Sequence, residues 1–142
     1  MAKVFLSHSS QNKDFVEPIA KLIKPYCFYD KFSFEEGEQT LSEIFNCMDA
    51  SDIFVYFISD SALNSDWVKN ELSKAEELFN KKRLKQIFPI IIDHAINHED
   101  ARIAAFLKKD YNLQHFDNHK IVARKIIQQL AKIEFEDRKS VV

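Results

Sequence analysis

Residues 53–58 read IFVYFI, and this stretch decides the fold. All six side chains are of the β-branched or aromatic types that favour extended backbone. A continuous apolar run of this length is typical of a strand that is covered on both faces. The run therefore predicts the central strand of a parallel sheet.

Shorter runs on either side of this stretch predict further strands. They are residues 3–7 (KVFLS), 26–29 (YCFY), 87–92 (IFPIII) and 111–116 (YNLQHF). Pro89 cannot donate a hydrogen bond to a neighbouring strand, so we place it near the beginning of its strand. The run at 111–116 is the weakest, and we expect it at an edge of the sheet.

Amphipathic segments alternate with these runs and predict helices. The first helix starts late, because Pro18 is tolerated only in a first turn. Thr40 and Glu43 form a capping box that opens the second. The later helices are expected at about 67–82, at 101–108 and at about 119–135. The long helix at 67–82 carries an apolar stripe of Trp67, Leu72, Ala75, Leu78 and Phe79.

This alternation predicts an α/β fold of the flavodoxin-like kind. The expected sheet is parallel and five-stranded, with the strand order 2-1-3-4-5 and helices on both faces. Residues 1–136 form this single domain, and residues 137–142 are expected to be a tail or a linker to a further domain.

Composition excludes several classes of function. Gly37 is the only glycine among 142 residues, which rules out a P-loop and a GxGxxG fingerprint, because both need several glycines. A net charge of −2 gives no sign of a nucleic-acid surface. No apolar run approaches the roughly 20 residues of a membrane helix, and no signal peptide is evident, so we expect a cytoplasmic chain. Cys27 and Cys47 lack metal-ligand spacing and are expected to be free thiols.

The predicted topology also places the functional site. In a sheet of this order, ligands bind outside the carboxyl ends of the strands, at the switch point between the first and third strands. Three polar segments border that point, at residues 8–12, 30–39 and 59–66.

Trp67 and Glu71 are the chemically suggestive pair near this rim. They lie four residues apart and so share one face of the predicted helix. An aromatic plane beside a carboxylate could hold a ribose ring. The alternative is that Trp67 belongs to the core and Glu71 is a surface acid favoured by the helix dipole, and spacing alone favours this alternative.

Other constellations are weaker. His94 and His98 have helical spacing, with acidic residues beside them, but their segment looks irregular, so we expect no metal site there. His115 and His119 share the spacing across a strand end. No GxSxG elbow is present, which disfavours a serine hydrolase. A phosphoacceptor receiver domain would need paired acids after the first strand, and none are found there.

Four motifs in register resemble those of a Toll/interleukin-receptor (TIR) domain. They are VFLSHSS at 4–10, FYDKFSFEEGE at 28–38, SDIFVYFIS at 51–59 and SDWVKNEL at 65–72. The resemblance covers residues 3–135 and implies a parallel five-stranded sheet. Many animal members of this family are adaptors, whereas many bacterial and plant members cleave NAD⁺ at the nicotinamide–ribose bond. The adaptor branch usually lacks the catalytic glutamate, so the resemblance favours the bacterial NADase type.

The resemblance implies roles for individual residues. Glu71 takes the place of the catalytic glutamate, with Trp67 four residues before it. Ser9, Ser10, Asp30 and Glu35 would line the pocket of the substrate NAD⁺, and His8 could stack on a ring. Some relatives carry arginines where Ser9 and Ser10 stand, so contacts to the pyrophosphate would come from backbone N–H groups, the serine hydroxyls or Lys31. No metal or cofactor is implied.

The loop at 30–39 is the assembly element of the family. In relatives it packs against a neighbouring TIR domain, which helps to complete the NAD⁺ site. Phe32, Phe34, Glu36 and Gly37 are the candidate contact residues here. Phe32 and Phe34 either find such a partner or fold back onto the core, and the sequence favours neither.

The sequence thus predicts an NAD⁺ glycohydrolase, with ADP-ribose cyclase activity as a variant. It would be activated by self-assembly as the effector part of a bacterial antiphage defence protein. The alternative is a non-enzymatic TIR–TIR interaction module, and a third and weaker interpretation is a host-directed virulence effector.

Overall fold

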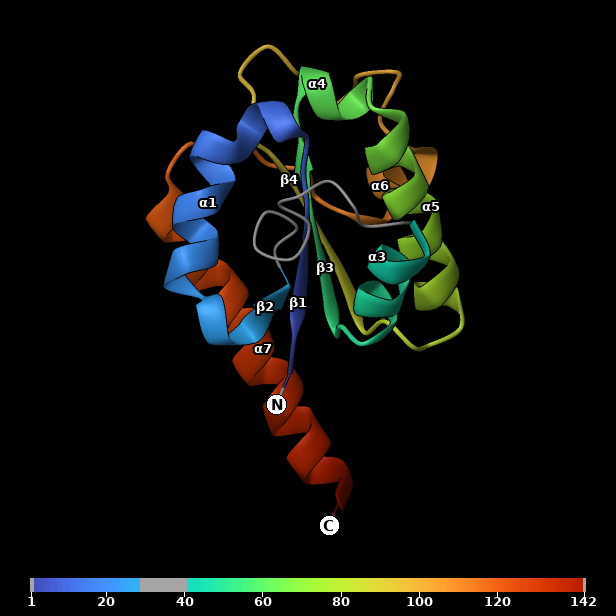
Figure 1. Ribbon diagram of the computed structural model, residues 1–142, viewed down its shortest axis with the longest axis vertical. Helices are drawn as coiled ribbons and strands as arrows, with labels where there is room; N and C mark the ends of the chain where they lie inside the picture. The colour runs from blue at the N-terminus through green and yellow to red at the C-terminus, as the bar shows by residue number, and fades with distance from the viewer. Residues whose placement is uncertain (1, 29–40, 142) are drawn as a thin grey trace.

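A computed structural model describes residues 2–28 and 41–141. Its sheet has the order β2-β1-β3-β4, and every pair of neighbouring strands is parallel (Figure 1). The strands are β1 (Val4–Ser7), β2 (Cys27–Phe28), β3 (Ile53–Ile58) and β4 (Gln86–Ile91). All six residues of β3 are buried, which confirms the prediction of a central strand.

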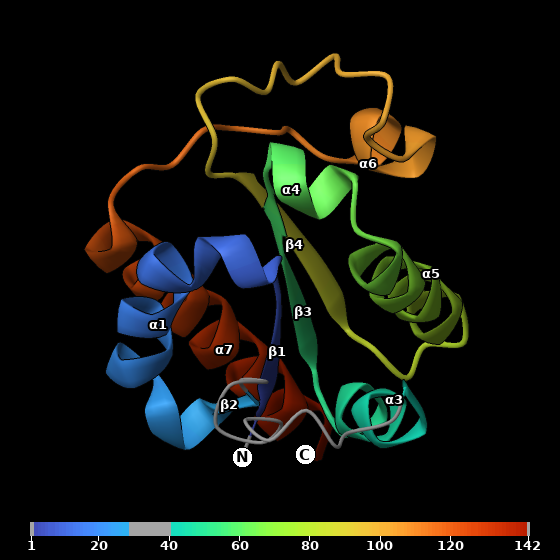
Figure 2. The same ribbon diagram turned by 45° about the horizontal axis from the view of Figure 1, so that its top comes forward.

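Helices cover both faces of the sheet, as predicted (Figure 2). One face carries α1 (Lys13–Leu22) and α7 (His119–Val141). The other carries α3 (Leu41–Asp49), α4 (Asp60–Leu63), α5 (Asp66–Asn80) and α6 (Ala105–Asp110). Two short 3₁₀ helices, η1 (Ser10–Asn12) and η2 (Lys24–Tyr26), flank α1.

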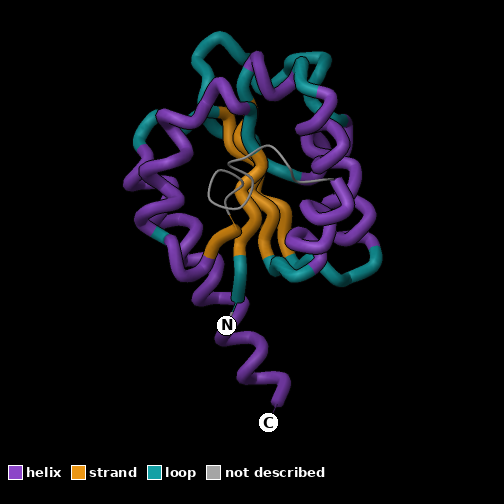
Figure 3. Tube along the Cα trace, in the orientation of Figure 1, coloured by secondary structure: helices purple, strands orange, loops and turns teal. Residues whose placement is uncertain are grey.

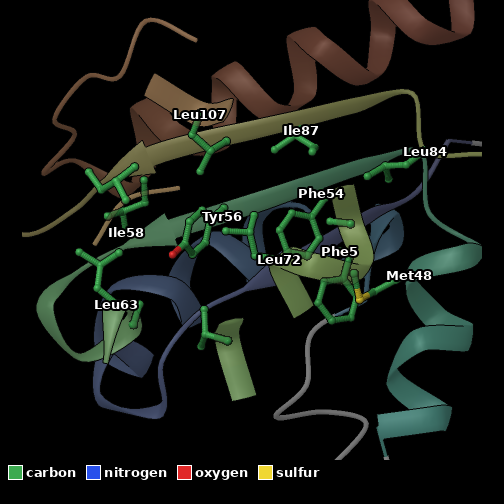
Figure 4. Packing of buried hydrophobic residues seen from close by; sticks show 14 of the residues in the cluster. Phe5, Met48, Phe54, Tyr56, Ile58, Leu63, Leu72, Leu84, Ile87 and Leu107 are labelled. Atoms are coloured by element: carbon green, nitrogen blue, oxygen red, sulfur yellow. The ribbon is translucent and has the colours of Figure 1, made fainter. Parts of the chain in front are cut away.

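The side chains of each strand alternate between two apolar cores. Val4 and Leu6 of β1 pack toward α1 and α7, whereas Phe5 packs toward α3 and α5. On that second face the rings of Phe5 and Phe54 are stacked, with centroids 5.8 Å apart (Figure 4). Continuous burial on both faces explains why every residue of β3 is aliphatic or aromatic.

The prediction of a fifth strand at 111–116 is wrong. Within the described residues, this segment makes only an isolated bridge, in which Ile91 N–H donates to the Gln114 carbonyl and Phe116 N–H donates to the Ile91 carbonyl. Pro89 lies two residues before Ile91, so its nitrogen faces the same outer edge of β4. Because proline has no N–H, the ladder cannot extend beyond that bridge.

Several predicted boundaries shift. Pro89 is the fourth residue of β4 rather than near its beginning, and Pro18 lies inside α1 rather than in its first turn. The helix α7 ends at Val141 rather than near residue 135, and its last turns project from the body of the domain (Figure 3). That residues 137–142 connect to another domain stays a prediction.

The end of α5 holds the one non-glycine residue with a positive φ in the described part of the chain. Lys82 has a φ of 63°, and the Arg83 N–H donates to the Leu78 carbonyl at 2.9 Å. This hydrogen bond is the Schellman arrangement, which normally places glycine at the left-handed position. The backbone of Lys82 therefore carries a steric cost that glycine would not.

We expect Lys82→Gly to raise the free energy of unfolding by about 0.5–1 kcal/mol, because it relieves that steric cost. Urea denaturation of the two proteins measures the change. The matched control is Lys81→Gly, because Lys81 has a φ of −84° and gains nothing from glycine. Equal effects of the two substitutions would contradict the explanation.

Candidate functional site

The buried face of α5 contains a carboxylate. The buried residues of this helix are Val68, Glu71, Leu72, Ala75 and Leu78. Glu71 is only 2% exposed, although glutamate is rarely buried unless it is paired. The alternative that Glu71 is a surface acid is therefore wrong.

Ser7 contacts this carboxylate directly. The Ser7 Oγ donates a hydrogen bond of 2.6 Å to Glu71 Oε1, and both side chains are buried. That length is typical of a hydroxyl bonded to a charged carboxylate. The contact joins the end of β1 to the second turn of α5.

The pair lies at the switch point of the sheet. Ser7 is the last residue of β1, and it is in register with Tyr56 of β3. The chain leaves β1 through α1 on one face, and α5 follows β3 on the other (Figure 2). Glu71 is thus held where the principle for open α/β sheets places ligands.

Sequence reasoning overlooked Ser7. The signal was available, because Ser7 is two residues after Phe5 and so shares its face of β1. A polar residue on a core-facing position at the carboxyl end of a strand indicates a nearby polar partner.

The next residues after β1 form the rim. His8 and Ser9 are buried, whereas Ser10 is exposed. The His8 Nδ1 lies 3.4 Å from the Leu6 carbonyl, and the Ser9 hydroxyl accepts from the Gln11 N–H at 3.2 Å and so caps η1. Of the two predicted serines, only Ser10 presents its side chain fully to solvent.

The rim extends to β3 through hydrogen-bonded side chains. The Asn12 Oδ1 accepts from the hydroxyl of Ser59 at 2.6 Å and from that of Ser61 at 3.2 Å. Ser59 also caps α4, because its Oγ accepts from the Ala62 N–H at 3.0 Å. These bonds join the loops after β1 and β3.

Trp67 lies in the first turn of α5, one turn before Glu71. Its side chain is 40% exposed, so the placement of Trp67 and of Phe79 in the core is wrong. The buried stripe begins one residue later, at Val68. Ser65 caps the helix by accepting from the Val68 N–H at 3.2 Å. An exposed indole on this turn is available to a ligand or a partner.

The loop after β4 is fastened to the rim by charged groups. The Arg102 guanidinium donates to Asp60 Oδ1 at 2.9 Å and to both oxygens of Asp100. Hydrogen bonds from Arg102 lower the pKa of Asp100 to about 2. The backbone N–H groups of Asp60 and Ala95 lower the pKa of Asp93. Arg102 is therefore engaged by carboxylates rather than presented to an anionic ligand.

Seven predicted site residues lie outside the described residues. They are Asp30, Lys31, Phe32, Phe34, Glu35, Glu36 and Gly37. The structure therefore positions the Glu71 side of the site and not the predicted loop wall.

The histidine pairs do not form the clusters that their spacing suggested. His94 stacks on His115, with centroids 6.5 Å apart, and His119 meets the edge of Phe15. Within residues 2–28 and 41–141, no three His, Cys, Asp or Glu side chains gather where they could hold a metal ion.

A surface groove of about 840 Å³ lies at the opposite end of the sheet from Glu71. It runs between the end of α5, the beginning of β4 and α7, and it contains none of the predicted site residues. Among the described helices, none is both long enough and apolar enough to cross a membrane.

The Glu71 site suits one kind of chemistry. A carboxylate in apolar surroundings interacts strongly with a positive charge that develops beside it. The hydroxyl of Ser7 fixes its orientation in advance, so little reorganisation is needed during a reaction. This arrangement fits the stabilisation of a cationic sugar in the cleavage of a glycosidic bond.

Comparison with protein families gives a match over most of the chain. A family model described as TIR domain matches residues 4–132. A comparison with curated proteins found no significant match.

Solved structures with the same fold include three proteins that are described as having different roles. The TIR domain of the Toll-related receptor TRR-2 from Hydra magnipapillata is 13% identical, with 96% of this chain and 98% of that chain covered and a TM-score of 0.59. The TIR domains of the activated Roq1 resistosome, which directly recognises the pathogen effector XopQ, are 16% identical, with coverages of 92% and 99% and a TM-score of 0.64. The CMP N-glycosidase BcmB of Clostridium botulinum is 14% identical, with coverages of 90% and 99% and a TM-score of 0.56. At these identities the likeness concerns the fold.

Proposed function

This chain belongs to the TIR domain family, and from that premise we propose that it is an NAD⁺ glycohydrolase that cleaves the nicotinamide–ribose bond. The observation that carries the proposal is the buried Glu71 carboxylate, which accepts a 2.6 Å hydrogen bond from Ser7 at the carboxyl end of β1. A buried acid costs free energy, so its retention at a ligand-binding position supports a functional role.

The proposed cleavage of NAD⁺ proceeds in two steps, loss of nicotinamide and addition of water. The bond between ribose C1′ and the nicotinamide nitrogen breaks, and its electron pair neutralises the positive ring that leaves. The ribose becomes an oxocarbenium-like cation, which the Glu71 carboxylate stabilises. Water then adds to C1′ and loses a proton, which gives ADP-ribose and nicotinamide. Attack by an atom of the bound ADP-ribose instead of water would give a cyclic product.

The likeness to BcmB supports the class of bond. That protein is described as a CMP N-glycosidase, so it acts on a bond between a base and a ribose. The bond proposed for this chain is also an N-glycosidic bond to a ribose. The fold therefore accommodates the proposed chemistry in a protein with 14% identity.

The proposal assigns the walls of the NAD⁺ site. Trp67 and His8 would pack against its rings, and Ser9 and Ser10 would contact its phosphates. Asp30, Lys31 and Glu35 would complete the pocket. The loop at 30–39, with Phe32, Phe34, Glu36 and Gly37, would contact another TIR domain in the active assembly.

The proposal includes a role in the cell. Destruction of NAD⁺ by an assembled effector would stop the metabolism of the cell that holds it. We therefore propose a function in bacterial antiphage defence, inside the cytoplasm.

The alternative function is a non-enzymatic TIR–TIR interaction module. The exposed indole of Trp67 supports it, because exposed tryptophan is favoured at protein interfaces. In that case Glu71 would hold α5 against β1 and would do no chemistry.

One experiment separates the two functions. The chain, either free in solution or clustered on beads, is incubated with NAD⁺. Free nicotinamide is then followed by chromatography. We expect release that increases with clustering. CMP is supplied in parallel, and release of cytosine in place of nicotinamide would move the proposal to a different substrate.

Ser7 is expected to act as a positioning residue for Glu71. We expect Ser7→Ala to lower kcat about tenfold and to leave KM nearly unchanged, because the carboxylate loses its fixed orientation. It should also lower the free energy of unfolding by about 1.5–3 kcal/mol, the range for a hydrogen bond to a charged group.

Ser51→Ala is the matched control for Ser7→Ala. The Ser51 hydroxyl is equally buried and donates to the Cys47 carbonyl at 2.8 Å, at the opposite end of β3. It should affect stability but not kcat. A Ser7→Ala protein with the wild-type kcat would contradict the positioning role.

A further inference from the structure

Tyr56 places a second polar side chain on the face of the sheet that holds Ser7 and Glu71. It lies in the middle of β3 and is only 2% exposed. Tyr56 is in register with Ser7 on the neighbouring strand, so the two side chains leave the same face of the sheet about 5 Å apart. The cluster around Tyr56 includes Leu63 of α4 and Leu72, the residue that follows Glu71 on α5.

The hydroxyl of Tyr56 points toward the carboxyl end of the strands. Figure 4 shows its oxygen directed away from Phe5 and Phe54, which occupy the half of the cluster nearer the start of the strands. The rings of Phe54 and Tyr56 are 6.5 Å apart and tilted by 37°, so Tyr56 does not continue the stack of Phe5 on Phe54. The phenol therefore leans toward the end of the sheet where Ser7 closes β1.

This hydroxyl makes no hydrogen bond to any residue that the structure describes. Within the described residues, its oxygen is not among the fully enclosed polar atoms that lack a partner, so it reaches the surface at the end of the strand. A tyrosine hydroxyl in apolar surroundings normally makes a hydrogen bond. Burial also raises the pKa of Tyr56 to about 12, so the group stays a neutral donor at physiological pH.

We propose that the Tyr56 hydroxyl is a ligand-contacting group of the Glu71 site, which donates a hydrogen bond to an oxygen of the substrate's ribose. The inference rests on the proposed NAD⁺ glycohydrolase function and adds a specificity-determining residue to it. Glu71 and Ser7 form the acidic part of the site, and Tyr56 supplies a neutral donor one strand further along. The substrate would then accept a hydrogen bond from a hydroxyl that makes none to the described residues.

The test is Tyr56→Phe, which removes only the hydroxyl. We expect KM for NAD⁺ to rise roughly five- to tenfold, as the loss of one hydrogen bond to an uncharged group implies. The melting temperature should stay nearly equal, because the hydroxyl that is removed makes no hydrogen bond to the described residues. A loss of substrate recognition without a loss of stability is a combination that a structural role would not produce.

Tyr111→Phe is the matched control. Tyr111 is a half-buried tyrosine that follows α6, and burial raises its pKa as well. Its hydroxyl lies outside the Glu71 site, so KM and kcat should not change. The thermal stabilisation of each protein by NAD⁺ is measured alongside, since a ligand that binds the folded state raises its melting temperature.

The outcomes separate the two proposals. If wild-type protein releases nicotinamide and Tyr56→Phe has the wild-type KM, the role of Tyr56 is refuted and the glycohydrolase stands. If Tyr56→Phe loses activity together with several degrees of melting temperature, the hydroxyl is structural and the inference is again refuted. If clustered wild-type protein neither releases nicotinamide nor is stabilised by NAD⁺, the proposed function fails, and the inference fails with it.

Discussion

Glu71→Gln is expected to reduce the release of nicotinamide from NAD⁺ by at least 100-fold. Glutamine has nearly the same shape but no negative charge, so it cannot stabilise the positive charge that develops on the ribose. Removal of a preorganised electrostatic group of this kind typically costs a factor of about 10²–10³ in kcat. The measurement is the initial rate of nicotinamide release by both proteins, clustered at equal density.

The fold should survive this change. The amide oxygen of glutamine can still accept the hydrogen bond that Ser7 donates to Glu71 Oε1. Burial of an amide is also less costly than burial of a charge, so the melting temperature should stay equal or rise. Glu77→Gln is the matched control on the same helix, because Glu77 lies on the solvent side and pairs with Lys74. A Glu71→Gln protein with more than a tenth of the wild-type rate would remove Glu71 from the chemistry.

Phe54→Ala is expected to lower the free energy of unfolding by about 3–5 kcal/mol, the range for a buried phenylalanine. Phe54 is fully buried in β3 and stacks on Phe5 of β1. The substitution removes the stacked ring and leaves a cavity that rigid strands on both sides cannot close. A domain of this size has about 5–15 kcal/mol of stability, so the loss is a large part of the whole. Urea denaturation followed by circular dichroism measures it.

Phe79→Ala provides the comparison for Phe54→Ala. Phe79 lies near the end of α5 and is partly exposed, so its truncation should cost about 1 kcal/mol or less. If both substitutions cost the same, the assignment of Phe54 to the centre of the core would be wrong.

The arrangement of the sheet was largely predictable, because a strand that is buried on both faces appears in the sequence as a continuous apolar run. The apolar run at 53–58 could only be a covered strand, and the alternation around it implied parallel neighbours. The prediction of a fifth strand failed because the outcome depends on which edge of β4 the nitrogen of Pro89 faces. That orientation follows from the register with β3, which the sequence alone does not show.

The site was predictable in part, for a similar reason. The spacing of Trp67 and Glu71 placed both on one side of α5, but spacing does not show how deeply each side chain is buried. Trp67 lies in the first turn and is partly exposed, whereas Glu71 lies one turn further along the same side and is buried. The contact between Ser7 and Glu71 joins residues 64 positions apart, and no local pattern predicts such a pair.

We propose above all that the buried Glu71 carboxylate promotes cleavage of the N-glycosidic bond of NAD⁺. The most direct measurement is a time course of free nicotinamide and ADP-ribose with the chain clustered on beads and NAD⁺ in excess. We expect nicotinamide to accumulate steadily, and its amount should equal the sum of linear and cyclic ADP-ribose. If NAD⁺ stays intact under these conditions while the clustered chain is folded, the claim is contradicted and the interaction module is favoured.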